Sequence, residues 1–500
     1  MANLKSLAKD TAIYGLSSIV GRFLNYLLVP LYTANLSAAS GGYGIITNMY
    51  AYSALLLVIL TYGMETTFFR FSNKEGEDAQ KVYSTILMAI GSTSLLFVAL
   101  VLLFLSPISS FMGYADHPSY VWVMAVTVAL DAFQCIPFAY LRYKKKAIKF
   151  AAFKMLFIIL NILLNLLFFL VLPALYASNP DTIGAIYDPA VGAGYAFYIN
   201  LACTGTITFC FYKELIGFRY VFDKALMRRM LSYSWPILVL GIAGILNQAA
   251  DKILFPYIYE GENAHEQLGI YGAASKIAMI MAMITQAFRY AYEPFVFGKA
   301  RESDNRDTYA KAMKYFIVFT LLAFLMVVGY MDILKHIIGR DYWSGLKVVP
   351  IVMAAEIMMG IYFNLSFWYK LIDKTIWGAW FSGIGCMVLL AINFIFVPRY
   401  GYTACAWAGF AGYGTAMLLS YFVGQKYYPI KYDMTGIAKY VVLAAVIFVL
   451  MSVCQKAFAS SAVTAAVNTL LIIVFMAYLV KKDFPLSSLP VIGKKFRKQK

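Results

Sequence analysis

The sequence predicts an all-helical integral membrane protein with about fourteen spanning helices. Hydrophobic residues make up 62% of the 500 residues and charged residues only 13%, whereas a soluble domain has roughly 25% charged residues. The mean hydropathy is +0.70, and apolar runs of about 20 residues, the length that crosses a bilayer, recur along the whole chain. Because soluble cores stop growing at roughly 250–300 residues, one soluble core is excluded.

Fourteen segments have the length and hydropathy of a spanning helix. We expect them at 11–33, 43–66, 82–105, 118–140, 150–172, 191–211, 229–254, 268–292, 309–331, 346–369, 375–397, 402–424, 437–455 and 462–480. The connecting loops are short, so the sequence predicts that the protein acts within the membrane or at its two faces.

The charge distribution supports an even number of spans with both termini in the cytoplasm. The net charge is +17. With the N-terminus inside, 33 of the 42 Lys and Arg residues fall in predicted cytoplasmic segments or at the span ends next to them, five on the outer side and four deeper within spans. Positive residues concentrate in cytoplasmic loops, and a miscounted span would invert every later loop. We therefore predict a multi-pass protein with cytoplasmic N- and C-termini.

The sequence offers no motif for catalysis, metal binding or nucleotide hydrolysis. The six Cys lack C-x-x-C spacing and the three His are far apart, so we expect no metal site. The ATPase phosphate-loop, H-E-x-x-H and G-x-S-x-G patterns are also missing from the sequence. We predict that the protein is not an enzyme and has no cofactor, so that an H⁺ or Na⁺ gradient, the membrane potential or a substrate gradient would drive any movement.

Two segments about 225 residues apart suggest an internal repeat. "LLVPLY" at 27–32 and "ILFPYI" at 253–258 both place a proline late in a predicted span, and each is followed by a short loop and a Gly-aromatic opening. The alternative is a chance match between apolar segments. A true repeat predicts two pseudo-symmetric six-helix lobes plus two extra helices, and related halves in transporters often enclose the substrate. The predicted domains are 1–222, 223–430 and 431–500.

Four cations lie inside predicted spans, where charge is costly and points to function. They are Arg22 in the first span, Lys252 in the seventh, and Lys276 and Arg289 in the eighth. Arg22 is roughly 16 Å from either end of its helix and shares a polar face with Asn25. These cations cluster at the start of the two predicted halves, so they predict a cavity that attracts an anion. The guanidinium group of Arg suits phosphate oxygens in particular.

Acidic and amide side chains accompany these cations. They are the possible coupling or ion-pair acids Glu65, Asp131, Asp251 and Glu293, and the polar residues Gln248 and Gln286. Several alternatives stay open. Glu65 or Asp131 could bind a coupling ion or pair with Arg22, Asp251 and Lys252 could form a solvated helix end, and Arg289 could pair with Glu293 one turn later.

Three phrases carry a resemblance to a known family. "GRFLNYLLVPLY" ends the first span, "GGYGIITNMY" opens the second, and "GMETTFFRF" at 63–71 ends it. Together with the span count, they make the chain similar to the polysaccharide flippases of the MOP superfamily. This group includes the O-antigen (Wzx-type) flippases and is related to lipid II flippases and MATE exporters. The individual motifs are degenerate, but the resemblance covers most of the chain.

This resemblance implies a flippase of the bacterial inner membrane with the MOP fold. It would carry an undecaprenyl-pyrophosphate-linked oligosaccharide to the outer leaflet by alternating access, for O-antigen, lipopolysaccharide or another polysaccharide. Arg22 and Arg289 would be the first contacts of the pyrophosphate or of acidic sugars, with Lys252 and Lys276 as second choices. Its implied partners are the lipid-linked substrate, the bilayer, a polysaccharide polymerase and glycosyltransferases, and no nucleic acid.

Two other functions are considered. A MATE-like drug or metabolite exporter coupled to a cation would normally have twelve spans and an acidic cation site. A membrane glycosyltransferase or polymerase would be expected to show long loops with paired carboxylates. The extra helix pair and the cationic spans favour the flippase over both.

Overall fold

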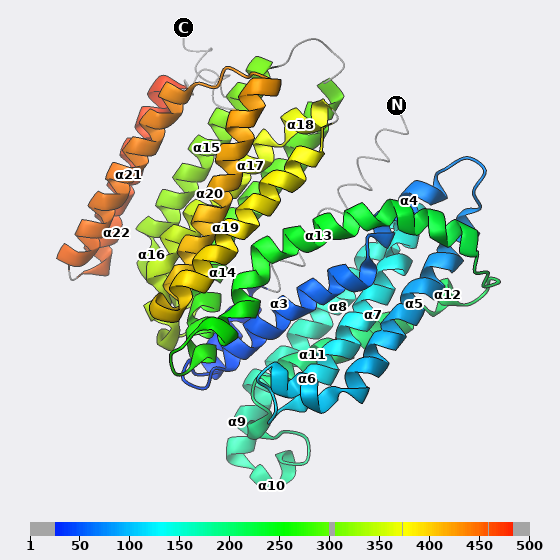
Figure 1. Cartoon of the computed structure of the whole chain (residues 1–500). Helices are drawn as coiled ribbons and strands as arrows, with labels where there is room; N and C mark the ends of the chain where they lie inside the picture. Colours follow the sequence, from blue (N-terminus) through cyan, green and yellow to red (C-terminus); the bar gives the residue numbers. More distant parts are fainter. Residues whose placement is uncertain (1–25, 300–305, 373, 459, 484–500) are drawn as a thin grey trace, which may run out of the picture. The chain divides into compact units, whose positions relative to one another are not determined.

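The computed structural model describes residues 26–299, 306–372, 374–458 and 460–483, which fold into helices without β-strands (Figure 1). Contacts divide the chain into two compact units. The first is Met1–Ala273 with Asn393–Tyr402, and the second is Ala274–Ile392 with Thr403–Lys500. The domain limits expected at 222 and 430 stay predictions.

The first unit is built from helices that follow one another along the chain. They are α2 (Leu28–Asn35), α3 (Gly42–Thr61), α4 (Met64–Ser72), α5 (Ala79–Leu103), α6 (Leu105–Phe111), α7 (Pro118–Tyr143), α8 (Ala147–Leu166), α9 (Leu172–Ser178), α10 (Pro180–Ile183), α11 (Gly194–Cys210), α12 (Tyr212–Leu215) and α13 (Lys224–Ile258). A π-helical turn at Leu167–Val171 joins α8 to α9. The first turns of α14 (Ala264–Lys299) also belong to this unit.

The second unit continues from α14. Its other helices are α15 (Arg306–Gly329), α16 (Met331–Leu334), α17 (Val349–Leu365), α18 (Phe367–Leu371), α19 (Ile376–Tyr400), α20 (Tyr402–Tyr427), α21 (Met434–Ala457) and α22 (Ser461–Lys482). A 3₁₀ segment at Arg340–Val348 leads directly into α17.

The helices confirm the predicted membrane class. Within the described ranges, eleven helical segments are long and apolar enough to cross a membrane. The expected spans at 191–211 and 402–424 correspond to α11 and α20, which are not among these eleven; α11 has only 17 residues. The first expected span falls largely on residues 1–25, outside the described residues. The total of fourteen therefore stays a prediction.

Helix α7 is the centre of the first unit. It packs against α3, α4, α5, α6, α8 and α11. Small residues such as Ala125, Ala129 and Ala132 are buried along it, and small side chains let neighbouring helices approach closely inside a membrane. Polar groups on α7 are therefore held between helices and kept from the bilayer, which would not accept them.

The second predicted span is broken rather than continuous. Its expected range was 43–66, but α3 ends at Thr61 and α4 begins at Met64. Tyr62 and Gly63 both have left-handed backbone angles, with φ of 32° and 74°. Glycine adopts this conformation without steric cost, so Gly63 permits the break. As a result, Glu65 lies in the first turn of a separate helix.

The last two helices pack on α15 in the second unit. Their shared core includes Val318 and Leu325 of α15, Tyr440 and Met451 of α21, and Phe475 of α22. The buried Asn468 amide on α22 donates a hydrogen bond of 2.8 Å to the carbonyl oxygen of Gly329. The predicted extra pair is thus fixed to its unit by apolar packing and by polar contacts.

Candidate functional site

One face of α7 carries a charged residue at each end and two uncharged residues between them. Asp131, Cys135, Phe138 and Arg142 lie four, three and four residues apart, which places them along one side of a helix with 3.6 residues per turn. The residues that meet this face come from α4, α8 and α11. We call Asp131, Cys135, Phe138 and Arg142, together with Glu65, Lys154 and Thr204, the α7 cluster.

The α4 end of the cluster is an ion pair. The Arg142 guanidinium donates to one carboxylate oxygen of Glu65, and the Cys135 thiol lies 3.3 Å from the other. The guanidinium carbon of Arg142 also lies 4.9 Å from the centre of the Phe69 ring. The Glu65 side chain is 44% exposed and that of Arg142 33% exposed. Both charges are therefore paired while remaining reachable from outside the protein.

The other end of the cluster holds a second acid and a second cation. The Thr204 hydroxyl donates to Asp131 at 3.2 Å. The Lys154 ammonium lies 4.1 Å from the centre of the Phe138 ring, a favourable cation–π arrangement, and it acts electrostatically on Asp131. Two carboxylates and two cations thus lie among the helices of one unit.

Sequence reasoning predicted the two acids of this cluster but missed both of its cations. Lys154 falls near the start of the span expected at 150–172 and is not among the four cations that the sequence places within spans; α8 begins at Ala147, so Lys154 lies two turns inside the helix. Arg142 was expected after the span that ends at 140, but α7 continues to Tyr143. The regular spacing of Asp131, Cys135, Phe138 and Arg142 was the available signal. Glu65 pairs with Arg142. The expected alternative of a pair between Glu65 and Arg22 stays a prediction, because Arg22 lies outside the described residues.

The acid and lysine predicted in the seventh span form a second polar site, near the end of α13. The Lys252 ammonium lies 3.1 Å from a carboxylate oxygen of Asp251, and the Tyr271 hydroxyl donates to the other oxygen at 2.7 Å. Asp251 is buried. The alternative of a solvated helix end is therefore wrong for Asp251. The Lys252 ammonium also donates to the backbone carbonyl of Gln248, one turn earlier, at 3.0 Å.

The predicted cations of the eighth span lie on α14 in the second unit. The guanidinium carbon of Arg289 lies 4.9 Å from the centre of the Phe363 ring of α17, and Arg289 is exposed. Lys276 and Gln286 are half-buried on the same helix. Glu293 lies in α14, but its side chain is outside the described part of the structure, so its predicted pairing with Arg289 is untested.

Arg22 and Asn25 lie outside the described residues. The structure places Glu65 and Asp131 at the two ends of the α7 cluster and Asp251 beside Lys252, but it does not test the common cavity predicted for the cations. That assignment stays a prediction.

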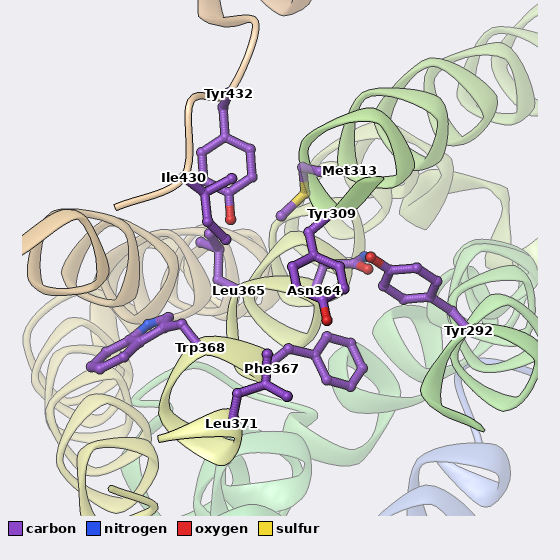
Figure 2. A pocket seen from close by; sticks show the side chains of 10 residues that line it. All are labelled: Tyr292, Tyr309, Met313, Asn364, Leu365, Phe367, Trp368, Leu371, Ile430 and Tyr432. Atoms are coloured by element: carbon purple, nitrogen blue, oxygen red, sulfur yellow. The ribbon is translucent and has the colours of Figure 1, made fainter. Parts of the chain in front are cut away.

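An enclosed pocket lies among aromatic side chains of the second unit (Figure 2). Its lining residues are Tyr292, Tyr309, Met313, Asn364, Leu365, Phe367, Trp368, Leu371, Ile430 and Tyr432. Its free volume of about 10 Å³ is the room of one water molecule, so no sugar or lipid fits there. Across the described ranges, no three His, Cys, Asp or Glu side chains converge to hold a metal ion.

Comparison with solved structures identifies the fold. The chain aligns with the lipid II flippase MurJ in an inward closed conformation with a TM-score of 0.71 and 15% identity, over 94% of this chain and 98% of that one. An inward-facing MATE multidrug resistance transporter of the MOP superfamily gives a TM-score of 0.57 and 15% identity, over 83% and 97% of the two chains. The MATE multidrug transporter DinF-BH gives 0.56 and 17%, over 83% and 95%. At such identities the likeness shows the fold alone.

Sequence comparison identifies the family. Among proteins with curated descriptions, none matches the chain. The family model described as polysaccharide biosynthesis protein matches residues 7–291, which is more than half of the 500 residues. The chain therefore belongs to the polysaccharide biosynthesis protein family, and it is a multi-pass membrane protein that shares its fold with the MurJ and MATE structures.

Proposed function

We propose that this protein moves a lipid-linked oligosaccharide across the bacterial inner membrane. The sugar is carried on undecaprenyl pyrophosphate and passes from the cytoplasmic to the outer leaflet, for O-antigen, lipopolysaccharide or another surface polysaccharide. Movement occurs by alternating access and without catalysis. In this proposal Arg22 and Arg289 contact the pyrophosphate or acidic sugars, and Lys252 and Lys276 assist.

The observation that carries the proposal is the family match over residues 7–291. The intramembrane charges agree with it. A phosphate-bearing head group cannot cross hydrocarbon unaided, and cations inside the spans reduce the cost of its passage. Arg289 is exposed on α14, with its guanidinium resting on Phe363. An aromatic ring can hold a guanidinium in place while its N–H donors stay directed at an anion.

The direct experiment is deletion of the gene followed by complementation. We expect the deletion strain to accumulate a lipid-linked oligosaccharide, identified by mass spectrometry, and to lose surface glycan. Arg22→Ala and Arg289→Ala should fail to restore surface glycan at unchanged protein abundance. Arg399→Ala is the matched control, because Arg399 is an exposed cation at the end of α19. Normal glycan display by both cavity variants would refute the role assigned to these two arginines.

A MATE-like exporter is the second candidate. The observation in its favour is the pair of in-span acids Glu65 and Asp131, since an acidic cation site is what an exporter coupled to H⁺ or Na⁺ requires. The same acids could couple a flippase to either ion. The deletion strain separates the two functions: altered drug tolerance without an accumulated lipid-linked intermediate would favour the exporter.

A further inference from the structure

An open groove lies between α5 and α13 in the first unit. Its free volume is about 990 Å³. The lining is mostly apolar with a few hydroxyl groups, and consists of Tyr62, Met88, Ala89, Ser92, Thr93, Phe222, Met227, Leu231, Ser232, Ser234, Trp235 and Leu238. The side chains at its mouth are strongly exposed: Trp235 is 65% exposed and Leu231 44%. The groove is therefore open at the surface of the first unit.

Two cations lie on the same side of α13 as the groove, closer to the start of the helix. Lys224 and Arg228 precede Leu231, Trp235 and Leu238 at helical spacing, so all five lie within one side of the helix. Both cations are exposed.

Neighbouring cations at this end of α13 are neutralised, but these two are not. Lys81 pairs with Asp223 at 2.6 Å, and Arg229 pairs with Glu77 at 2.5 Å. In the described part of the chain, neither Lys224 nor Arg228 has a carboxylate partner. The groove thus ends in two adjacent positive charges that can still accept an anion.

The dimensions match one leaflet of a bilayer. Ten residues separate Arg228 from Leu238, a rise of about 15 Å, and the hydrocarbon core of a bilayer is about 30 Å thick. Under the predicted orientation, α13 begins at the cytoplasmic face. The cations would then lie at the cytoplasmic interface, and the apolar groove would reach to the middle of the membrane.

We propose that this groove is the loading site for the polyprenyl pyrophosphate portion of the substrate. The polyprenyl chain lies along Leu231, Trp235 and Leu238, and the pyrophosphate binds Lys224 and Arg228. A pyrophosphate carries at least two negative charges, which two adjacent cations match, whereas an ordinary phospholipid carries a single phosphate. This site rests on the proposed function for its occupant, but it is separate from the cavity assigned to Arg22 and Arg289.

The test is site-specific photocrosslinking in vesicles. The full-length protein carries a benzoylphenylalanine at position 235 (Trp235→benzoylphenylalanine) in phosphatidylethanolamine–phosphatidylglycerol vesicles that contain a small fraction of undecaprenyl pyrophosphate. Trp380→benzoylphenylalanine is the matched control, since Trp380 of α19 is 61% exposed. After irradiation, mass spectrometry identifies the lipid joined to each position. We expect the polyprenyl adduct to be enriched several-fold at 235 over 380.

The charge requirement is tested in the same vesicles. Lys224→Gln combined with Arg228→Gln should reduce the polyprenyl adduct at 235 several-fold, and Arg399→Gln should leave it unchanged. Phospholipid adducts at 235 in proportion to their abundance, equal polyprenyl yields at 235 and 380, or no effect of the double substitution would each overturn the loading site.

If the deletion strain accumulates a lipid-linked oligosaccharide but the enrichment at 235 fails, only this inference is lost. If the enrichment is found but no intermediate accumulates, the proposed function is lost instead.

Discussion

At the scale of single residues, the α7 cluster shows how four charges are kept inside one helical unit. Glu65 meets Arg142, and Asp131 is bound by Thr204 near Lys154. Breaking one pair leaves an uncompensated charge among apolar helices, which is costly unless water reaches it. The sequence predicted Glu65 and Asp131 as important acids, because charge in a span is rare. It could not predict Arg142 as the partner of Glu65, because no local spacing relates residues 77 positions apart in the chain.

A double-mutant cycle measures the Glu65–Arg142 pair. Glu65→Gln and Arg142→Gln should each destabilise the protein in detergent, and the double variant should recover part of the loss. We expect a coupling energy of about 1–2 kcal/mol, below the roughly 3–5 kcal/mol cost of breaking a fully buried pair, because both side chains are partly exposed. The pair Lys335–Asp332, whose residues are three apart in the chain, is the control and should couple by less than about 0.5 kcal/mol, as such local pairs do. Equal coupling in the two pairs would contradict a special role for Glu65–Arg142.

At the scale of helices, the sequence predicted which helices exist and in what order better than it predicted where each helix begins and ends. Apolar runs of about 20 residues locate the spans, but hydropathy does not register where a helix continues past its apolar part. For this reason α7 includes Arg142, which the sequence assigned to a loop, and α8 begins earlier than expected, so that Lys154 lies two turns inside it. The break at Tyr62 and Gly63 was also missed. It depends on backbone angles that apolar periodicity does not encode.

Close packing between α3 and the start of α14 provides a test at this scale. A Cβ atom on Gly44 would lie 1.8 Å from the carbonyl oxygen of His265, a backbone atom that cannot rotate away. Gly44→Ala should therefore destabilise the protein by about 3 kcal/mol or more, seen as lost folded protein after detergent extraction. Gly205→Ala on α11 is the control, since a Cβ there would meet nothing within 4 Å, and it should be neutral or slightly stabilising. Similar yields for the two variants would refute the close contact.

At the scale of the whole molecule, the predicted extra pair of helices is α21 and α22, joined to α15 by a charged cluster. The Lys314 ammonium of α15 lies 2.9 Å from Asp433, just before α21, and 2.6 Å from Asp483, just after α22. The Tyr440 hydroxyl donates to Asp483 at 2.5 Å. The sequence predicted the two helices from their hydropathy, but not their attachment, because residues 314, 433 and 483 are brought together only by folding. Lys314 thus ties both ends of the pair to the same helix.

This cluster predicts a specific dependence of stability on pH. The hydrogen bond from Lys314 lowers the pKa of Asp433. Burial alone would raise the pKa of Asp483, but hydrogen bonds from Lys314 and Tyr440 outweigh it, so that pKa is lowered too. A carboxyl group whose pKa is lower in the folded state stabilises the fold above its ordinary pKa of about 4, and this contribution is lost as the pH falls below that value.

The midpoint of thermal unfolding in detergent should therefore fall as the pH drops below about 4. Lys314→Met should lower the midpoint at neutral pH, where the ion pairs exist in the native protein. On acidification its midpoint should fall less than that of the native protein, because the variant has no Lys314 ion pairs for protonation to break. Lys311→Met, an exposed position one turn earlier on α15, should follow the native curve. Parallel pH curves for Lys314→Met and the native protein would show that Lys314 does not hold the helix pair in place.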